Sequence, residues 1–299
     1  MKRLIATLTI GILVLSFVAS LAGALSYAHQ QYRTITTARG EVVEVADAGV
    51  YRYSLRTLVT GGAPWDVVWL GLAIPAFAVA FGLHRRGSVR GTLLFVGMLA
   101  SFLYKYLLWT FDWAYNPLYL IYVAMFSLSL WTLVLVLSDL DGDQIRAAIG
   151  PRFPVRTLTA FSFAIGGLLL LKCLGEIVPT IWSNTLPPVA TGYYTLVDQG
   201  LDLGLLTPFC MMSGILLLKR ESLGYVLSTS ALLLSLMIGI SVITGEVMLG
   251  RSTGHVNVLG VAVFSVFIVG ALALLGTVLT NIRRQAPLAE PVAEKPRAA

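Results

Sequence analysis

Charged residues are scarce in this chain. Asp, Glu, Lys and Arg together make up 12% of the 299 residues, about half of their share in soluble domains. Hydrophobic residues make up 57%, and the mean hydropathy is +0.82. A soluble domain cannot bury that much apolar surface, so the composition predicts an integral membrane protein with several spans.

Cysteine and histidine are also rare, with two and three residues respectively. Cys173 and Cys210 lie within apolar runs, and their spacing fits neither a C-x-x-C motif nor a zinc site. His29, His84 and His255 fall in three different connections between apolar runs. The sequence therefore predicts neither a metal site nor a cofactor.

Motifs of common enzymes are absent as well. No G-x-S-x-G, Walker A or H-E-x-x-H sequence occurs. The acidic run from Asp139 to Asp143 resembles the start of a calcium loop, but Gln144 and Gly150 stand where an EF-hand requires glycine and glutamate. Asp143 is instead predicted to cap a short helix over 144–149. These absences favour a protein that is not an enzyme.

Eight apolar runs are long enough to cross a bilayer, whose core needs about 20 residues of helix. They cover approximately residues 4–25, 67–83, 91–111, 118–137, 157–180, 195–218, 225–249 and 257–282. The predicted fold is therefore all-α, a polytopic transmembrane helix bundle. Its expected parts are a first helix or signal over 1–25, an extracytoplasmic loop over 26–66, a seven-helix bundle over 67–282 and a disordered cytoplasmic tail over 283–299.

The first apolar run also has features of a cleavable signal peptide. Lys2 and Arg3 precede it, and small residues follow at 22–24. Cleavage after Ala24 would leave seven spans and an N-terminus outside the cell. The run is longer than the roughly 7–15 residues of a signal core, which favours an uncleaved helix.

The loop 26–66 has two interpretations. Its valines and tyrosines, interrupted by Gly40 and Gly49, are typical of a small β-hairpin that covers the helices. A loosely ordered loop is the alternative.

Basic residues gather on one side of the predicted spans. This side holds 14 of the 21 Lys and Arg residues, in the termini and in alternate connections. The positive-inside rule then places both termini in the cytoplasm of a cell-membrane protein. The net charge of +6 thus reflects topology, and the expected partner is the lipid bilayer and not nucleic acid.

Two similar stretches suggest an internal repeat. Residues 70–75 read LGLAIP and residues 203–208 read LGLLTP, and each is followed by a basic turn. A parallel duplication of four spans plus four, related by an axis along the membrane normal, would produce this pattern. Chance matching among common membrane residues is the alternative. Pro75 and Pro208 are expected to kink their helices.

Ionisable residues within the spans mark a candidate site. At 1.5 Å rise per residue they all fall in the outer half of the membrane. The deeper layer contains Lys105, Lys172 and Asp202, and the shallower layer contains Glu176, Asp198 and Glu246. A charge at the bilayer centre costs at least about 2.5–3.5 kcal/mol, so we expect these side chains to share one polar pocket. Tyr104 and Asn116 are expected at its edge.

Acidic residues outnumber basic ones in this group. Asp198 and Asp202 lie four residues apart on one helix face, where two like charges repel unless a cation or a proton intervenes. Arginines from the loops, such as Arg52, Arg56 or Arg251, are another source of balancing charge. The alternative is structural: Lys105 extends toward the interface, and Asp112, Asp198 and Glu246 simply face water.

The pattern predicts a membrane protein that binds a small cation, a proton or a polar solute in an outward-facing pocket, as a transporter or sensor. A scaffold or assembly partner of another membrane protein is the second interpretation. An intramembrane enzyme that acts on a lipid-linked substrate through two carboxylates is the third.

Three stretches carry a resemblance to a known family: RRGSVRGTLLFVGMLASFLYKY, AYNPLYLIYVAMFSLSL and DLGLLTPFCMMSGILLLKRESLGYVL. With the motifs Tyr115-Asn116-Pro117 and Asp202-Leu203-Gly204, they resemble a widespread family of uncharacterised prokaryotic multi-pass membrane proteins over about residues 49–279. The resemblance implies membership of that family, and it implies no activity, cofactor or catalytic residue.

Overall fold

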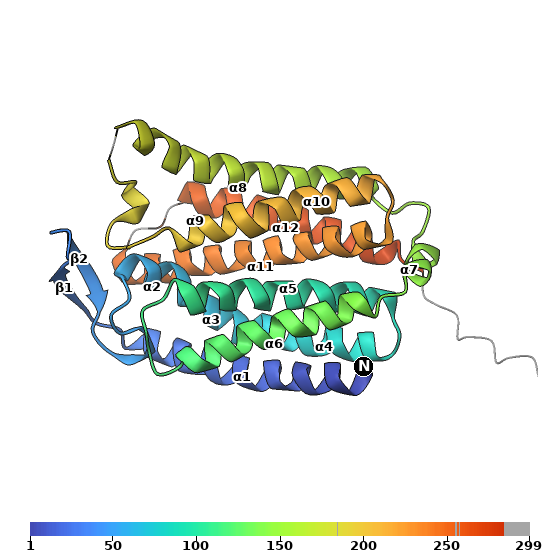
Figure 1. Ribbon diagram of the computed structural model, residues 1–299, viewed down its shortest axis with the longest axis horizontal. Helices are drawn as coiled ribbons and strands as arrows, with labels where there is room; N and C mark the ends of the chain where they lie inside the picture. Colours follow the sequence, from blue (N-terminus) through green and yellow to red (C-terminus); the bar gives the residue numbers. More distant parts are fainter. Residues whose placement is uncertain (184, 255, 257, 284–299) are drawn as a thin grey trace, which may run out of the picture.

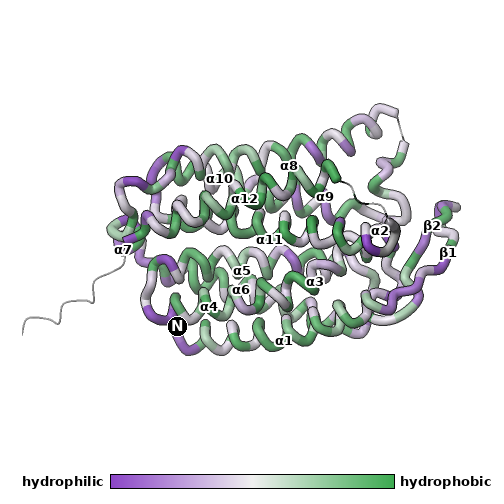
Figure 2. The backbone as a smooth tube through the Cα atoms, turned by 180° about the vertical axis from the view of Figure 1, so that it is seen from behind, coloured by the Kyte–Doolittle hydropathy of each residue, from purple (hydrophilic) through white to green (hydrophobic). Residues whose placement is uncertain are grey.

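The protein is an elongated bundle of membrane-length helices. The computed structural model describes residues 1–183, 185–254, 256 and 258–283. Within these residues, eight helical segments are long and apolar enough to span a membrane, which confirms the predicted all-α polytopic bundle. The helices run side by side along the long axis (Figure 1). Apolar residues predominate along the middle of the bundle, and polar residues gather near its two ends (Figure 2).

The first half of the chain supplies four spans. The first is α1 (Lys2–Ala28). The second is a series of helical pieces: α2 (Arg56–Gly62), α3 (Pro64–Val68), the π-helical η2 (Trp69–Ala73) and α4 (Ile74–Arg85). The third and fourth are α5 (Val89–Phe111) and α6 (Tyr119–Ser138). The second span thus begins well before the predicted run 67–83, so Asp66 is part of the bundle and not of the preceding loop.

The second half repeats this plan. The short α7 (Gly142–Ala148) leads to α8 (Val155–Ser183). The sixth span consists of α9 (Val197–Leu201), the π-helical η4 (Asp202–Leu206) and α10 (Thr207–Leu218). α11 (Ser222–Thr253) and α12 (Val258–Thr280) complete the bundle.

The cap of α7 differs from the prediction. The carboxylate of Asp141, and not that of Asp143, accepts hydrogen bonds from the amides of residues 143 and 144, each at 3.0 Å. The helix therefore begins earlier than expected.

The segment after α1 forms the β-hairpin that was one of the two interpretations. β1 (Tyr32–Thr36) and β2 (Val42–Ala46) pair antiparallel, and Gly40 takes φ +82° in the connecting turn. A 3-10 turn, Gly49–Tyr51, then inserts Tyr51 into the core. We call this end of the bundle the hairpin end, and the opposite end, with α7 and the N-terminus, the basic end (Figure 1). The predicted tail lies almost entirely outside the described residues.

The second span of the first half and the sixth span correspond element by element. A shift of 133 residues, from Pro75 to Pro208, superimposes the bounds of α3 on those of α9, of η2 on η4, of α4 on α10, and the start of α5 on that of α11. A Cβ at Gly91 would collide with the backbone of Leu83, and a Cβ at Gly224 would collide with that of Leu216, which is the same contact after the same shift. This agreement favours the duplication over chance matching.

The two central helices meet at equivalent positions. The spans that contain α5 and α11 are each 72% buried, far more than the other six, and the two helices pack together. A Cβ at Gly97 of α5 would approach the Cα of Ser230 of α11 to 3.2 Å, and these positions are related by the same shift. Equivalent residues contact one another only near a twofold axis. The pseudo-twofold axis therefore passes between α5 and α11.

A π-turn lies just before each of the two prolines that were expected to kink their helices. η2 and η4 each end immediately before the residue that precedes Pro75 or Pro208. Proline cannot donate a backbone hydrogen bond and clashes with the carbonyl one turn earlier, and a wider turn relieves that clash. Asp202 is the first residue of η4, so the second irregularity lies at the candidate site.

Candidate functional site

A closed polar centre lies within the first half of the bundle. Lys105 of α5 is fully buried, and its Nζ lies 2.6 Å from Oδ1 of Asp66, which is 2% exposed. Nζ also donates to Oγ of Ser20 at 3.2 Å. The indole rings of Trp69 and Trp109 lie 4.7 and 4.8 Å from Nζ, a favourable arrangement for an ammonium group. Lys105 is thus satisfied by the protein itself.

Tyr51 and Gly23 complete this centre. The hydroxyl of Tyr51 donates to Oδ2 of Asp66, and burial, followed by the charge of Asp66, raises the pKa of Tyr51 well above its usual range. A Cβ at Gly23 would overlap both that hydroxyl and the carboxylate. We call Ser20, Tyr51, Asp66 and Lys105 the closed polar centre.

A second group of ionisable residues lies in the other half. The hydroxyl of Tyr104 donates to Oδ1 of Asp202 at 2.6 Å. Nζ of Lys172 lies 4.0 Å from Oδ2 of Asp202, and Gln199 donates to Oε2 of Glu176 at 3.3 Å. We call Glu176, Asp198 and Asp202, together with Lys172 and Gln199, the acidic cluster.

The predicted single pocket is therefore divided. Lys172, Glu176, Asp202 and Tyr104 come together as expected. Lys105 does not join them, because its side chain points into the first half toward Asp66. The side chains of adjacent helix residues point in directions about 100° apart, so the consecutive residues Tyr104 and Lys105 of α5 contact different halves of the bundle.

A cavity of about 640 Å³ opens at the hairpin end, above both groups. Its walls come from β2, α2, the end of α5, and the segment between α8 and α9. Asp198 and Gln199 connect it with the acidic cluster. Trp65, Trp109 and Trp113 form an aromatic wall, with ring centroids 5.9 Å apart for the first two and 5.0 Å apart for the last two.

Asp112 lies on the wall of this cavity. Burial, and next the charge of Asp198, raise its pKa to about 6. Tyr193 faces the same space, and burial together with the charge of Asp112 raises its pKa to about 12. Two carboxyl groups therefore repel each other here, beside a phenol that stays protonated.

The loop arginines expected to balance the acidic residues contribute little positive charge to the cavity. Among the arginines considered in the sequence, Arg56 lines the wall, but its Nη1 lies 2.7 Å from Oε2 of Glu44, which lines it too. This ion pair leaves the carboxyl groups deeper in the cavity without compensation from Arg56.

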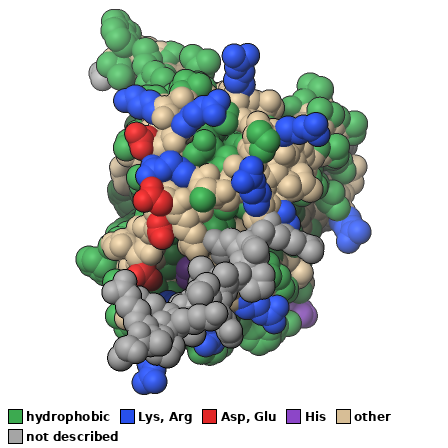
Figure 3. Space-filling model, turned by 90° about the vertical axis from the view of Figure 1, so that its right-hand side faces the viewer, with side chains coloured by type: hydrophobic (Ala, Val, Ile, Leu, Met, Phe, Trp, Pro, Cys, Tyr) green, Lys and Arg blue, Asp and Glu red, His purple; other side chains and the backbone are tan. Residues whose placement is uncertain are grey.

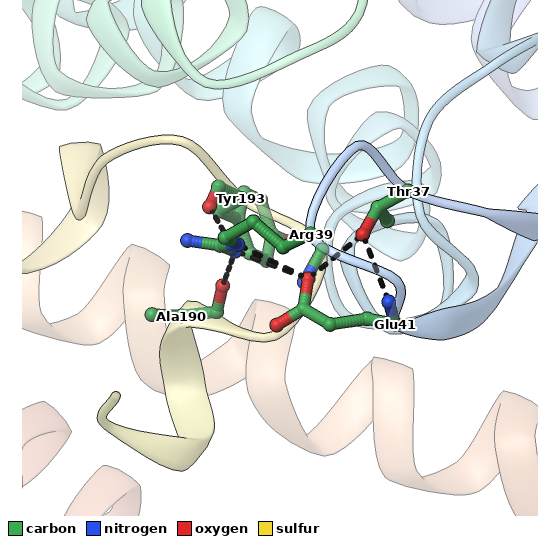
Figure 4. Close-up of polar contacts among 6 residues, drawn as sticks. Thr37, Arg39, Glu41, Ala190 and Tyr193 are labelled. Atoms are coloured by element: carbon green, nitrogen blue, oxygen red, sulfur yellow. Dashed lines mark hydrogen bonds and ion pairs between the residues drawn. The ribbon is translucent and has the colours of Figure 1, made fainter. Parts of the chain in front are cut away.

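A hydrogen-bonded clasp joins the hairpin turn to the segment 188–193 (Figure 4). Four residues of that segment line the cavity, and we call the segment its roof. Nη2 of Arg39, in the hairpin turn, donates to the carbonyls of Ala190 and Tyr193 at 2.9 and 2.6 Å. Oε2 of Glu41 accepts from the Gly192 amide at 3.1 Å. Burial opposes ionisation of Glu41, but the Gly192 amide and the side chains of Arg39 and Thr37 outweigh it and lower its pKa. The hairpin of the first half thus holds a segment of the second half over the cavity.

Two predicted site residues lie elsewhere. The Oδ1 of Asn116 accepts from the Leu118 amide at 2.9 Å, and its Nδ2 donates to the Ala114 carbonyl at 3.1 Å. Asn116 is thus a turn-forming residue at the start of α6. Glu246 is half-buried on α11, and it is not among the described residues that line the cavity.

Sequence reasoning identifies neither Asp66 as the partner of Lys105 nor Asp112 as part of a cavity wall. Asp66 follows Pro64 and Trp65, and proline at the first position of a helix was the available signal that a span begins there. For Asp112 the sequence favours a position in water at the membrane interface, because it does not show the loops that fold over this residue.

Comparisons with protein-family models, with curated proteins and with solved structures found no match. The family resemblance suggested by the sequence stays a prediction.

Proposed function

We propose that this protein binds a small cation in the hairpin-end cavity, as a transporter or a sensor. The observation that carries the proposal is that Asp112 and Asp198 line one partly enclosed cavity beside an aromatic wall. Half-buried carboxylates that repel each other are stabilised by a bound cation.

The charge balance supports a cationic ligand. Lys105 is neutralised by Asp66, and Arg56 is paired with Glu44. The cavity and the acidic cluster then contain Asp112, Glu176, Asp198 and Asp202 against the single amine of Lys172. A proton on one carboxyl group relieves part of this excess, so protons compete with the cation.

The aromatic wall narrows the class of cation. Trp65, Trp109 and Trp113 line a space large enough for a molecule of several non-hydrogen atoms. Indole faces attract ammonium groups, most strongly where water is displaced. An organic ammonium compound fits this combination of carboxylates and indoles better than a bare metal ion, which requires several oxygen ligands at fixed geometry.

The proposed topology places the hairpin end outside the cell and both termini in the cytoplasm of the cell membrane. The concentration of Lys and Arg at the basic end supports it through the positive-inside rule. The cavity would then face the outside, as expected for the entry site of a transporter or the input site of a sensor.

A scaffold function is the second candidate, and Lys172 favours it. The side chain of this residue is 47% exposed on α8, at membrane depth. A charge on a lipid-facing surface is unfavourable, and a partner helix with a polar side chain would cover it.

The test is ligand-dependent thermal stability of the purified full chain, with choline, an alkylamine, Na⁺ and a neutral sugar as probes. Binding to the folded state raises the midpoint, and the stabilisation grows with the logarithm of the ligand concentration once that concentration exceeds Kd. We expect a rise with choline or the amine that is lost in Asp198→Asn and kept in Asp47→Asn, a carboxylate at the same end that pairs with Arg33. If none of the tested cations changes the midpoint, the proposal is rejected and the scaffold function is favoured.

A further inference from the structure

A second pocket, of about 540 Å³, lies at the basic end. It is formed where the α7–α8 connection meets the turn between α10 and α11. Arg146, Arg156 and Arg220 line it, together with Phe153 and Tyr225. Figure 3 views this end of the molecule, where Lys and Arg side chains are widely spread and a few acidic side chains gather toward one side.

Backbone contacts hold the connection between α7 and α8, which lines this pocket. The amide of Gly150 donates to the carbonyl of Asn281 at 2.7 Å, and the amide of Arg283 donates to the carbonyl of Ala148 at 2.8 Å. The rings of Phe153 and Tyr225 pack edge to face, 5.1 Å between centroids, and both are buried. The arginines are therefore carried on a preformed frame.

Two of the three arginines retain uncompensated charge. Arg146 shares its guanidinium with Asp143 at 2.7 Å and with Glu221 at 4.0 Å. Among the described residues, neither Arg156 nor Arg220 forms an ion pair. An anion would be attracted mainly to these two.

The backbone at Arg220 provides an independent indication. Arg220 takes φ +55°, a left-handed conformation that side chains disfavour. The equivalent position in the first half, under the shift of 133 residues, is Gly87 with φ +74°. Glycine would suit the turn in both halves, so the second half keeps an arginine despite its conformational cost. Such outliers are concentrated at functional sites.

We propose that this pocket binds the phosphate group of an anionic lipid. Guanidinium groups match phosphate oxygens in pairs, and basic pockets between spans at the membrane surface are typical sites for anionic headgroups. The pocket lies where α8 begins, α10 ends and α11 begins, which is the level of the headgroups. Ile149 and Val155 add apolar wall for the glycerol region of a lipid. This inference is independent of the proposed cation site.

The test titrates the full chain in uncharged detergent with phosphatidylglycerol, phosphatidylcholine or inorganic phosphate, and counts bound molecules by native mass spectrometry. The pocket variant is Arg156→Gln with Arg220→Gly, in which glycine suits the turn. The matched control is Arg85→Gln with Arg86→Gln, two arginines near the equivalent turn of the first half that are not among the residues lining this pocket. A second variant, Arg156→Lys with Arg220→Lys, keeps the charge.

We expect phosphatidylglycerol to bind the wild type, the control and the lysine variant with similar affinity. Its affinity for the pocket variant should be lower by about tenfold or more. If inorganic phosphate binds and phosphatidylglycerol does not, and the pocket variant no longer binds phosphate, the phosphate site is supported and its ligand is a soluble phosphate compound. Equal binding of phosphatidylglycerol by the wild type and the pocket variant would overturn the proposal.

Discussion

Tyr104 and Lys105 are consecutive residues of α5, yet their side chains reach acidic partners in opposite halves of the bundle. The Tyr104 hydroxyl lies 2.6 Å from Asp202, and the Lys105 amine lies 2.6 Å from Asp66. Because α5 packs beside the pseudo-twofold axis, any rotation of this helix changes both contacts together. α5 is thus the element through which the closed polar centre and the acidic cluster are mechanically joined.

The Lys105–Asp66 pair is expected to be essential for stability although it lies far from solvent. In Asp66→Asn the ammonium stays buried without its counter-charge, which costs about 3–5 kcal/mol. In the double variant Asp66→Leu with Lys105→Met both charges leave together, and the loss should be smaller than in the single variant. Thermal midpoints in one detergent, measured with the same protein concentration, compare the three proteins. A double variant less stable than Asp66→Asn would contradict this account.

Gly23 is expected to tolerate no larger residue. A Cβ there would overlap the carboxylate of Asp66 and the hydroxyl of Tyr51, so Gly23→Ala must displace the closed polar centre. We expect a loss of about 1–3 kcal/mol, as for other overpacked interiors. Gly11→Ala on the same helix is the control, because its nearest neighbour, Leu128, would lie at an ordinary contact distance of 3.5 Å. The difference between the two thermal midpoints measures the effect. Equal midpoints would contradict this prediction and show that the closed polar centre rearranges around the added methyl group without loss of stability.

Much of the fold was predictable from the sequence, because apolar runs of sufficient length require spanning helices. The grouping of Lys172, Glu176 and Asp202 was predictable for a related reason, since helix rise places the three residues at similar heights along neighbouring spans. The partner of Lys105 was not, because pairing depends on which way each helix is rotated, and the sequence does not give rotation. Asp66 shows this most clearly: its residue type indicates a loop boundary, whereas it lies in α3, which packs against α1 and α11.

The cavity could not be predicted from the sequence either. Its roof depends on Arg39 reaching carbonyls 151 and 154 residues later in the chain. Contacts at such separation leave no periodic signal. Asp112 therefore looked like a solvated helix end, although the hairpin and the segment before α9 enclose it.

The clasp is expected to control access to the cavity. Arg39→Ala removes the donors to Ala190 and Tyr193 together with the ion pair to Glu41, so the segment from 188 to 193 should open locally. Hydrogen exchange of the amides of residues 190–193 should become faster, by about tenfold or more, while the global free energy of unfolding changes by less than about 1 kcal/mol. Arg33→Ala, which removes an exposed pair with Asp47, is the control. Unchanged exchange in Arg39→Ala would show that the roof is held by other contacts.

The stability of the empty protein should rise as the pH falls through 6. The folded-state pKa of Asp112 is raised from 3.8 to about 6, so ionisation of this group disfavours the folded state above that pH. The penalty is present at pH 7, declines as the pH falls through about 6 and is gone near pH 4, for a total of up to about 2–3 kcal/mol. A bound cation reverses the sign, because it favours the ionised carboxylate and displaces the proton. Choline binding should therefore strengthen between pH 5 and pH 7, and Asp112→Asn should flatten both pH profiles. Thermal midpoints at each pH, with and without choline, separate the two effects. A wild-type profile that matches that of Asp112→Asn would show that this carboxyl group does not titrate in the range where the cavity is proposed to exchange protons for a cation.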